Sequence, residues 1–372
     1  MRLHPGLAAL LVLALGGAAA APAARAQARA PDAVRLAAYG DDEGTCRRWN
    51  EPPAGGTACE EAPYRPGRWA CPRGENPRLA RLLAWLRSQA AAFHAVLHSG
   101  DFVRFDRDVG RYGAALGPLA GRFFPTTGGD QEFRAGRFRA FVEGHAPHIR
   151  LGDRAGPSGR RCALCYHAYV KSPEMPLGVH VVSLENPDQY GDEKGFYKAN
   201  CSPTHNLYSA PRGDAAAHQF AWLQETLEET ARLRKEPGRA RDAVVVLTHR
   251  PPPLRSAGTE DLRDLFARTG VDLVIAGDIH VYARGEAQGV HYFVTGIAGD
   301  FPTGCGTFLP RGYDECRPER PGRRPAPECD RTACDHFLDI AITPDRIAVR
   351  ARLIDRLPAD EAMDTVTWPR RR

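Results

Sequence analysis

Aspartate and histidine residues follow five short apolar runs of this sequence, each at the point where the run ends. In the clearest case the run Ala95–His98 leads to Gly100 and Asp101, where the glycine allows a tight turn and the aspartate can point beyond the strand. The other runs and the residues that follow them are Val34–Tyr39 with Asp41, Arg122–Thr127 with Asp130, Ala243–Thr248 with His249, and Val271–Ala276 with Asp278 and His280. Since the carboxyl ends of neighbouring parallel strands meet at one edge of a sheet, we expect these side chains to converge there.

Carboxylates and imidazoles gathered in this way predict a hydrolytic metal centre. Oxygen ligands favour hard ions, and histidine adds affinity for iron, zinc or manganese. Two ions that share one carboxylate would generate hydroxide at neutral pH and neutralise charge on a phosphoryl group. A structural interpretation stays open for each residue, because a buried histidine can be satisfied by hydrogen bonds alone and an aspartate after a glycine can form a turn.

The elements that must position these residues alternate along the chain. Asn76 and Pro77 are typical of a helix start, and the leucines that follow share one face, so this helix is expected to pack on a sheet. The strand Ala95–His98 comes next, which completes a βαβ unit and predicts a parallel sheet. The same alternation recurs in a helix from Asp214, a strand at Ala243–Thr248, a helix at Thr259–Thr269 and a strand at Val271–Ala276.

Further strands are predicted outside these units. Tyr166–Val170 and Val179–Leu184 are expected to pair with each other, and His336–Thr343 and Ile347–Leu353 are expected to form a hairpin. The arginine-rich stretch after Trp368 is predicted to be disordered, because a run of like charges is usually solvated.

Residues 1–28 have the features of a secretory signal peptide. Arg2 precedes the apolar run Leu7–Ala21, and Ala-x-Ala sites ending at Ala26 and Ala28 follow it. An uncleaved anchor is the alternative, although the run is short for a bilayer. We expect an exported protein, periplasmic or secreted, with no stable membrane span in the mature chain and a single domain over residues 29–372.

The chain has ten cysteines, all after the predicted signal, and an even number in an exported chain favours disulfides. Two Cys-rich stretches, at about residues 45–74 and 305–334, are predicted to be surface insertions held by disulfides whose connectivity the sequence leaves open. Cys162 and Cys165 form a Cys-x-x-Cys pair, and a zinc site or a redox pair is the alternative to a structural disulfide there. The net charge of +5 predicts a weak attraction for anionic substrates, and no nucleic-acid partner is expected.

The order of the motifs resembles that of the calcineurin-like metallophosphoesterases, and within them the purple acid phosphatase-like branch. That family shows Asp-x-His or Asp-x-Gly, then Gly-Asp, Gly-Asn-His-Asp/Glu, a lone His after an apolar strand, and Gly-His-x-His. The counterparts here are Asp41-Asp42-Glu43-Gly44, Gly100-Asp101, Gly129-Asp130-Gln131-Glu132, Thr248-His249-Arg250-Pro251 and Gly277-Asp278-Ile279-His280. The resemblance implies an α/β fold of the four-layer α/β/β/α sandwich type over about residues 34–354.

The resemblance also implies a ligand set in which Asp101 bridges two ions of manganese, iron, magnesium, calcium or zinc. The further ligands implied are Asp41, Glu43 and His280 for one ion, and Asp130, His249 and Asp278 for the other. The first motif can be aligned from Asp41, which pairs it with Glu43, or from Asp42; we favour Asp41 because it follows the glycine of its strand directly. The additional carboxylates favour the harder ions over zinc.

Three positions depart from the family pattern. Asp130 stands where the family has asparagine, Gln131 where it has the histidine that assists the leaving group, and Asp278 where it has the first histidine of the last motif. Both aspartates can bind metals, so the ligand set is altered in type and not erased. Gln131 occupies the catalytic position without an acidic proton, and His98 or His205 is the candidate for that role, with a structural histidine as the alternative.

We therefore expect an exported metal-dependent phosphoesterase that hydrolyses phosphomonoesters or phosphodiesters by attack of a metal-bound hydroxide. The alternative is a non-catalytic protein of the same fold that binds a ligand or partner through the altered crevice. A nuclease of the same superfamily is a third possibility. The sequence leaves the substrate, the metal and the oligomeric state open.

Overall fold

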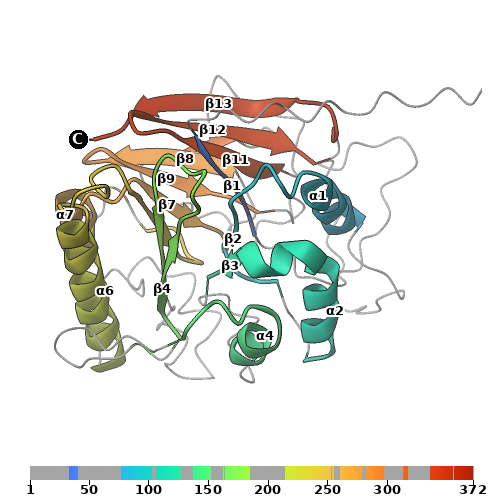
Figure 1. Ribbon diagram of the computed structural model, residues 1–372, viewed down its shortest axis with the longest axis horizontal. Coiled ribbons are helices and arrows are strands. Elements are labelled where there is room, and N and C mark those ends of the chain that lie inside the picture. Colours follow the sequence, from blue (N-terminus) through green and yellow to red (C-terminus); the bar gives the residue numbers. More distant parts are fainter. Residues whose placement is uncertain are drawn as a thin grey trace, which may run out of the picture.

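The computed structural model describes residues 33–40, 77–102, 106–126, 137–151, 162, 164–184, 214–252, 254, 260–278, 282–296, 313–316, 336–354 and 356–371. The predicted signal peptide and most of both predicted insertions lie outside these residues. The described chain forms two β-sheets that face each other, with helices on the outer side of each sheet (Figure 1). The predicted α/β/β/α sandwich is confirmed.

The first sheet contains six strands, which are β1 (Val34–Tyr39), β2 (Ala95–His98), β3 (Phe123–Pro125), β11 (His336–Ile342), β12 (Arg346–Leu353) and β13 (Ala362–Pro369). Their order across the sheet is β13-β12-β11-β1-β2-β3. Strands β1, β2 and β3 are parallel, with Tyr39 opposite His98 and His98 opposite Pro125. The residues that follow these three strands therefore leave the sheet at the same edge.

The second sheet contains seven strands, which are β4 (Tyr166–Val170), β5 (Val179–Ser183), β6 (Ala243–Leu247), β7 (Leu273–Ala276), β8 (Tyr282–Ala287), β9 (Val290–Val294) and β10 (Tyr313–Cys316). Their order is β10-β8-β9-β7-β6-β5-β4. Strands β5, β6, β7 and β9 are parallel, so that the residues after β6 and β7 also emerge at one edge. The predicted pairing of β4 with β5 and the predicted hairpin of β11 with β12 are confirmed.

The helices divide between the two sheets, as Figure 1 shows. Those beside the first sheet are α1 (Pro77–Ser88), α2 (Asp106–Leu116), the 3-10 helix η1 (Gly117–Arg122) and α4 (Arg137–His145). Those beside the second sheet are α6 (Asp214–Leu233) and α7 (Glu260–Thr269). Among the described helices, none has the length and apolar character that a bilayer crossing requires.

Strand β6 shows why the sequence reads as an unbroken apolar run at this point. Val245 belongs to the apolar cluster that fills the space between the sheets. Its neighbours Val244 and Val246 belong to a second cluster with Trp222 of α6 and Phe266 of α7. Since alternate side chains of a strand point to opposite faces, both faces of β6 are buried, as expected for a central parallel strand.

The prediction for the residues after Trp368 is wrong. Strand β13 continues to Pro369, and Arg370 is buried, with 7% of its surface exposed. Its guanidinium donates hydrogen bonds to both carboxylate oxygens of Asp272, at 3.0 and 3.1 Å. A local pattern of like charges indicated a solvated stretch, whereas the partner of Arg370 lies 98 residues away in the sequence.

Candidate metal centre

The two strand ends that carry Asp101 and Asp278 share an uncommon backbone conformation. Asp101 follows β2 with a φ of 59°, and Asp278 follows β7 with a φ of 68°, both in the left-handed region. A residue other than glycine in this region costs of order 1–3 kcal/mol and is enriched at functional sites. Gly100, with a φ of 100°, takes the turn just before Asp101. The sharp turn predicted from the Gly-Asp sequence is confirmed.

A close approach between β1 and β2 accounts for the glycine that ends β1. A Cβ atom added to Gly40 would lie 1.8 Å from Ser99 Oγ and 3.0 Å from Ser99 Cβ. The backbone N–H of Ser99 donates to Tyr39 O at 2.9 Å, which continues the ladder between the two strands to this point. Only a residue without a side chain fits beside Ser99 here, so Gly40 sets how closely the two strand ends approach.

His249 is brought to the end of β2 from the other sheet. It follows β6, is completely buried, and its Nδ1 lies 2.8 Å from the carbonyl oxygen of Ser99. Because a carbonyl can only accept a hydrogen bond, Nδ1 carries the proton and donates it. The other ring nitrogen, Nε2, lies 3.5 Å from Asp101 Oδ1 and 3.6 Å from Asp278 Oδ1. The structure thus brings together three of the predicted ligands from three strand ends.

This arrangement of His249 fits a bound cation. In the neutral ring the lone pair of Nε2 faces two carboxylate oxygens, which is unfavourable unless a positive charge lies between them. Two ligand atoms that share one ion, each about 2.1 Å from it, lie roughly 3.0–3.4 Å apart. The observed distances of 3.5 and 3.6 Å are close to that range.

The described side chains do not complete an ion site by themselves. Within the described ranges, no group of three or more His, Cys, Asp or Glu side chains could hold a metal ion unaided. The other predicted ligands and the predicted catalytic glutamine, which are Asp41, Glu43, Asp130, His280 and Gln131, lie outside the described residues. Their roles remain predictions.

Arg250 is a site residue that the sequence analysis did not single out. Its side chain is buried, with 7% of the residue exposed, and its Nε lies 3.6 Å from Asp278 Oδ2. The Thr248 hydroxyl donates to the Arg250 carbonyl at 3.2 Å, which holds the turn after β6. The guanidinium offsets part of the negative charge that Asp278 adds at a position where the family has histidine. The signal in the sequence was the basic residue directly after the lone histidine.

His98, the predicted substitute acid, lies beneath the Gly100 turn. It is fully buried, and its Nδ1 accepts the backbone N–H of Gly100 at 3.0 Å. Its ring packs edge-on against Tyr39 and Phe102, with ring centroids 4.7 and 5.2 Å away. In this position His98 supports the turn that presents Asp101, and its role as an acid remains a prediction. His205 lies outside the described residues.

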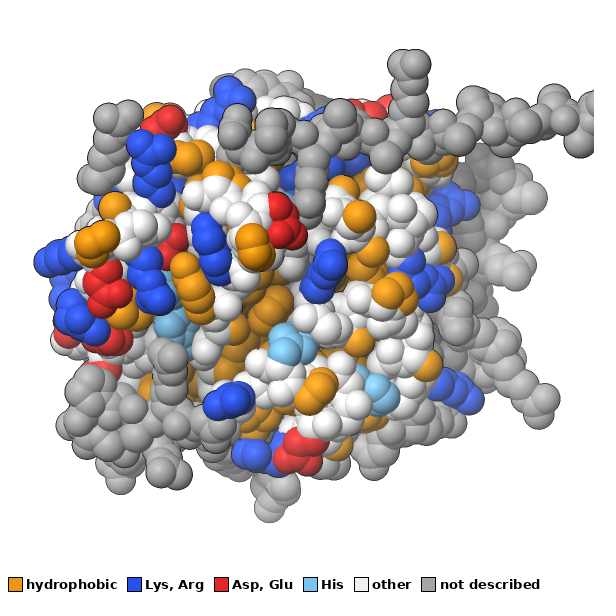
Figure 2. All heavy atoms as spheres, in the orientation of Figure 1, with side chains coloured by type: hydrophobic (Ala, Val, Ile, Leu, Met, Phe, Trp, Pro, Cys, Tyr) orange, Lys and Arg blue, Asp and Glu red, His pale blue; other side chains and the backbone are white. Residues whose placement is uncertain are grey.

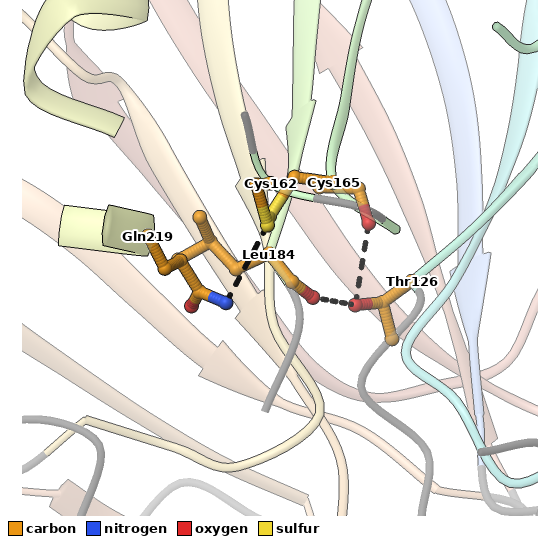
Figure 3. The surroundings of a disulfide bond; sticks show 6 residues. Thr126, Cys162, Cys165, Leu184 and Gln219 are labelled. Atoms are coloured by element: carbon orange, nitrogen blue, oxygen red, sulfur yellow. Dashed lines mark hydrogen bonds between the residues drawn. A yellow bond between two sulfur atoms is a disulfide. The ribbon is translucent and has the colours of Figure 1, made fainter. Parts of the chain in front are cut away.

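A disulfide lies near the end of β5, in the apolar cluster between the second sheet and its helices (Figure 3). Cys162 and Cys165 are joined with an S–S distance of 1.99 Å, and the side-chain amide of Gln219 on α6 donates to Cys162 Sγ at 3.7 Å. Beside it, the Thr126 hydroxyl donates to Leu184 O at 3.1 Å and so links the end of β3 to the end of β5. The first contact fastens the loop before β4 to α6, and the second joins the two sheets at the edge that carries the candidate centre.

The calcineurin-like phosphoesterase family model matches residues 72–282, more than half of the 372 residues, and the match includes Asp101, His249 and Asp278. No curated protein matches the chain.

Among solved structures, a dimetal phosphatase from Danio rerio is similar to this chain with a TM-score of 0.50 and 14% identity, over 91% of this chain and 100% of that one. GAP50, the anchor in the inner membrane complex of Plasmodium, aligns with a TM-score of 0.47 and 12% identity, over 92% of this chain and 90% of that one. The purple acid phosphatase from yellow lupin (Lupinus luteus) seeds aligns with a TM-score of 0.45 and 14% identity, over 90% of this chain and 53% of that one. At these identities the likeness concerns the fold.

Proposed function

Because this chain belongs to the calcineurin-like phosphoesterase family, we propose that it hydrolyses phosphate monoesters or diesters at a dinuclear metal centre. The observation that carries the proposal is the position of His249 Nε2, 3.5 Å from Asp101 Oδ1 and 3.6 Å from Asp278 Oδ1. A histidine nitrogen that faces two carboxylates at the end of three strands is suited to hold a cation.

In this proposal Asp101 is the residue shared by two ions. The ligands proposed for one ion are Asp41, Glu43 and His280, and those proposed for the other are Asp130, His249 and Asp278. The metal pair, when bound, would activate water and neutralise charge on the phosphoryl group. We propose manganese, iron, magnesium or calcium in preference to zinc, because carboxylates outnumber histidines in this set.

The protein's own part in the reaction is to fix these groups. The Ser99 carbonyl holds the His249 ring through Nδ1, so that Nε2 keeps its lone pair toward the site. His98 holds the Gly100 turn through the 3.0 Å hydrogen bond to its Nδ1, and that turn orients Asp101. Arg250 lies beside Asp278, where its positive charge favours the binding of a phosphate oxyanion.

The proposed substrate is an ester with a good leaving group. Gln131 replaces the family histidine that assists the leaving group, and an amide cannot donate an acidic proton. General acid assistance is typically worth about a hundredfold or more in rate. Aryl esters, which need little protonation on departure, are therefore expected to be hydrolysed faster than alkyl esters.

Export is the second part of the proposal. The features of residues 1–28 and the even number of cysteines support it. The test is the N-terminal sequence of the mature protein recovered from outside the cytoplasm, which is expected to begin near residue 29. Recovery of the uncleaved chain in the cytoplasm would contradict this part alone.

The second candidate function is that of a non-catalytic binding protein of the same fold. Gln131 and Asp278 favour it, because both replace residues that the active family uses. Metal analysis separates the two candidates, since a binding-only protein is expected to carry fewer than two ions per chain.

The decisive experiment is the hydrolysis of an aryl phosphate and an aryl phosphodiester with each candidate ion in turn. Asp101→Asn is expected to lower turnover by about a hundredfold or more, because it removes the shared carboxylate. Asp345→Asn removes an exposed carboxylate from a turn of the first sheet and is the matched control, expected to keep full activity. Absence of turnover with every ion, in a folded sample, would refute the catalytic proposal.

A further inference from the structure

A cationic pocket lies at the end of the second sheet opposite to the candidate metal centre. It has a volume of about 410 Å³ and is formed where α6 and α7 end, where β7 begins and where β13 ends. We call it the arginine pocket, after the lining residues Arg234, Lys235, Arg268, His291, Arg370 and Arg371. Figure 2 shows Lys and Arg side chains gathered on the left of the molecule, where these elements lie in Figure 1.

The arginine pocket is separate from the candidate centre. Asp272 lines it just before β7 begins, whereas Asp278 of the centre follows the end of the same strand. Six residues of extended chain span roughly 20 Å, at about 3.3 Å per residue. A ligand in the pocket would therefore not reach the side chains proposed to hold the metals.

The carboxylate that lines the pocket is already neutralised. Asp272, the one acidic residue among the described lining residues, accepts hydrogen bonds from Arg370 at 3.0 and 3.1 Å. The Arg370 guanidinium also donates to the carbonyl oxygens of Arg241 and Asp242, at 2.7 and 3.0 Å. This buried pair is neutral as a whole and forms one wall of the pocket, and the carboxylates nearest to Arg268 and His291, which are Glu228 and Glu286, are solvent-exposed.

The remaining cations are only partly compensated. Arg268 pairs with Glu228 at 2.7 Å on the exposed rim. Arg234 donates to the Gly270 carbonyl at 2.7 Å, which satisfies a donor without cancelling the charge. Lys235 and Arg371 are exposed at the mouth of the pocket. At least three positive charges thus face one cavity.

Burial is the main influence on the pKa of two basic groups that line the pocket. Burial lowers the pKa of the Arg234 guanidinium; the attraction of Asp272 and Asp242 opposes this shift, and the neighbouring charge of Arg370 adds to it. Burial likewise lowers the pKa of His291, with Arg371 acting in the same direction and Glu286 and Asp272 in the opposite one. Basic groups that are partly desolvated in this way are stabilised in their charged form when an anion enters the cavity beside them.

We propose that the arginine pocket binds a small anion that carries phosphate groups. Guanidinium groups match phosphate oxygens with paired hydrogen bonds, and an ammonium group adds a point charge. The volume lies in the range of pockets that enclose small ligands. The phosphate can belong to a free anion or to a lipid headgroup, and the experiment separates these two sources.

The test is isothermal titration of the full-length protein with inorganic pyrophosphate at low salt. Lys235→Gln combined with Arg371→Gln removes two exposed charges of the pocket and is expected to weaken binding by about tenfold or more. The matched control is Arg111→Gln with Arg356→Gln, which removes the same charge from exposed positions elsewhere. The control is expected to bind pyrophosphate as the wild type does, Asp101→Asn is expected to keep the binding that the pocket variant loses, and added salt is expected to weaken binding.

A parallel measurement uses vesicles of phosphatidylcholine with and without phosphatidic acid. The phosphate belongs to a lipid if the wild type and the Arg111→Gln/Arg356→Gln control bind the phosphatidic acid vesicles and the Lys235→Gln/Arg371→Gln variant does not. Pyrophosphate binding without binding to these vesicles assigns it to a free anion. The proposal is overturned if neither probe binds, if both double variants weaken binding equally, or if Asp101→Asn alone abolishes it. The last result would place the anion at the metal centre, so failure here is distinguishable from failure of the proposed function.

Discussion

If Asp101 binds metal ions as proposed, ion binding should stabilise the folded protein, and this stabilisation should depend on the Asp101 carboxylate. An ion that binds the native state and not the unfolded chain, at a free concentration a hundred times its Kd, adds about 2.7 kcal/mol of stability. For a domain of this size that corresponds to a rise of about 4 °C in the melting temperature. Asp101→Asn is the perturbation that should remove this gain.

The magnitude follows from the observed geometry. An ion held between His249 Nε2 and Asp101 Oδ1, which are 3.5 Å apart, lies closer to the carboxylate than this distance, so the Asp101 charge contributes at least about 5 kcal/mol at an effective dielectric constant of 20. Because 1.4 kcal/mol corresponds to tenfold in affinity, removal of this charge is expected to weaken ion binding by about a thousandfold. The stabilisation at the same ion concentration then falls to about 0.1 kcal/mol.

The assay is thermal unfolding of the wild type, Asp101→Asn and Asp345→Asn, each with EDTA and with manganese. The wild type and the Asp345→Asn control should melt higher with manganese, whereas Asp101→Asn should melt at the same temperature in both conditions. An equal rise in Asp101→Asn would show that the ion binds elsewhere, and the reasoning from His249 would be refuted.

Three further predictions concern the fold around the two sites. Arg370→Met should lower the free energy of unfolding by about 3–5 kcal/mol, because it leaves Asp272 buried without its cation; urea titration measures this. Gly40→Ala should cost about 1–3 kcal/mol, because the new Cβ would lie 1.8 Å from Ser99 Oγ, and it should also weaken metal binding. Burial raises the pKa of Asp242, but the His180 imidazole 3.8 Å away and hydrogen bonds from the Gly178 N–H and the Tyr169 hydroxyl outweigh it and bring the pKa below the ordinary value. The ionised Asp242 carboxylate therefore stabilises the fold above its unfolded pKa of about 3.9, and this stability is lost as the pH falls below that value. In unfolding measurements over a series of acidic pH values, Asp242→Asn should lose less stability than the wild type as the pH falls.

Each of these has an outcome that contradicts it. Exposed Arg346→Met is the control for Arg370→Met, and equal stability losses would mean that the buried pair contributes nothing. Adding Ser99→Gly to Gly40→Ala should restore much of the lost stability, because it removes the side chain with which the new Cβ clashes. If stability does not recover in the double variant, this clash is not the cause of the loss. Identical acid profiles for wild type and Asp242→Asn would exclude the assigned pKa direction.

Local sequence determined the strands and the turns that deliver the site. The apolar runs before Asp101, His249 and Asp278 form strands as predicted, because their apolar pattern acts within a few residues, and Gly100 and Gly277 mark the turns before the two aspartates. The same short-range signals predicted β11 with β12 and the pairing of β4 with β5. The choice of family followed from the order of these motifs.

Tertiary structure decided what the side chains do. The proton of His249 is fixed by the Ser99 carbonyl, which lies 150 residues earlier and in the other sheet, so no local pattern encodes it. Arg250 and Asp278 come from two different strand ends and meet only when β6 and β7 lie side by side. The arginines after Trp368 look solvated in the sequence, yet Arg370 is buried, because its carboxylate partner is supplied from 98 residues away. Charge and hydrogen-bond interactions act through space between residues that are distant in the sequence, so the local sequence around one residue does not identify its partner.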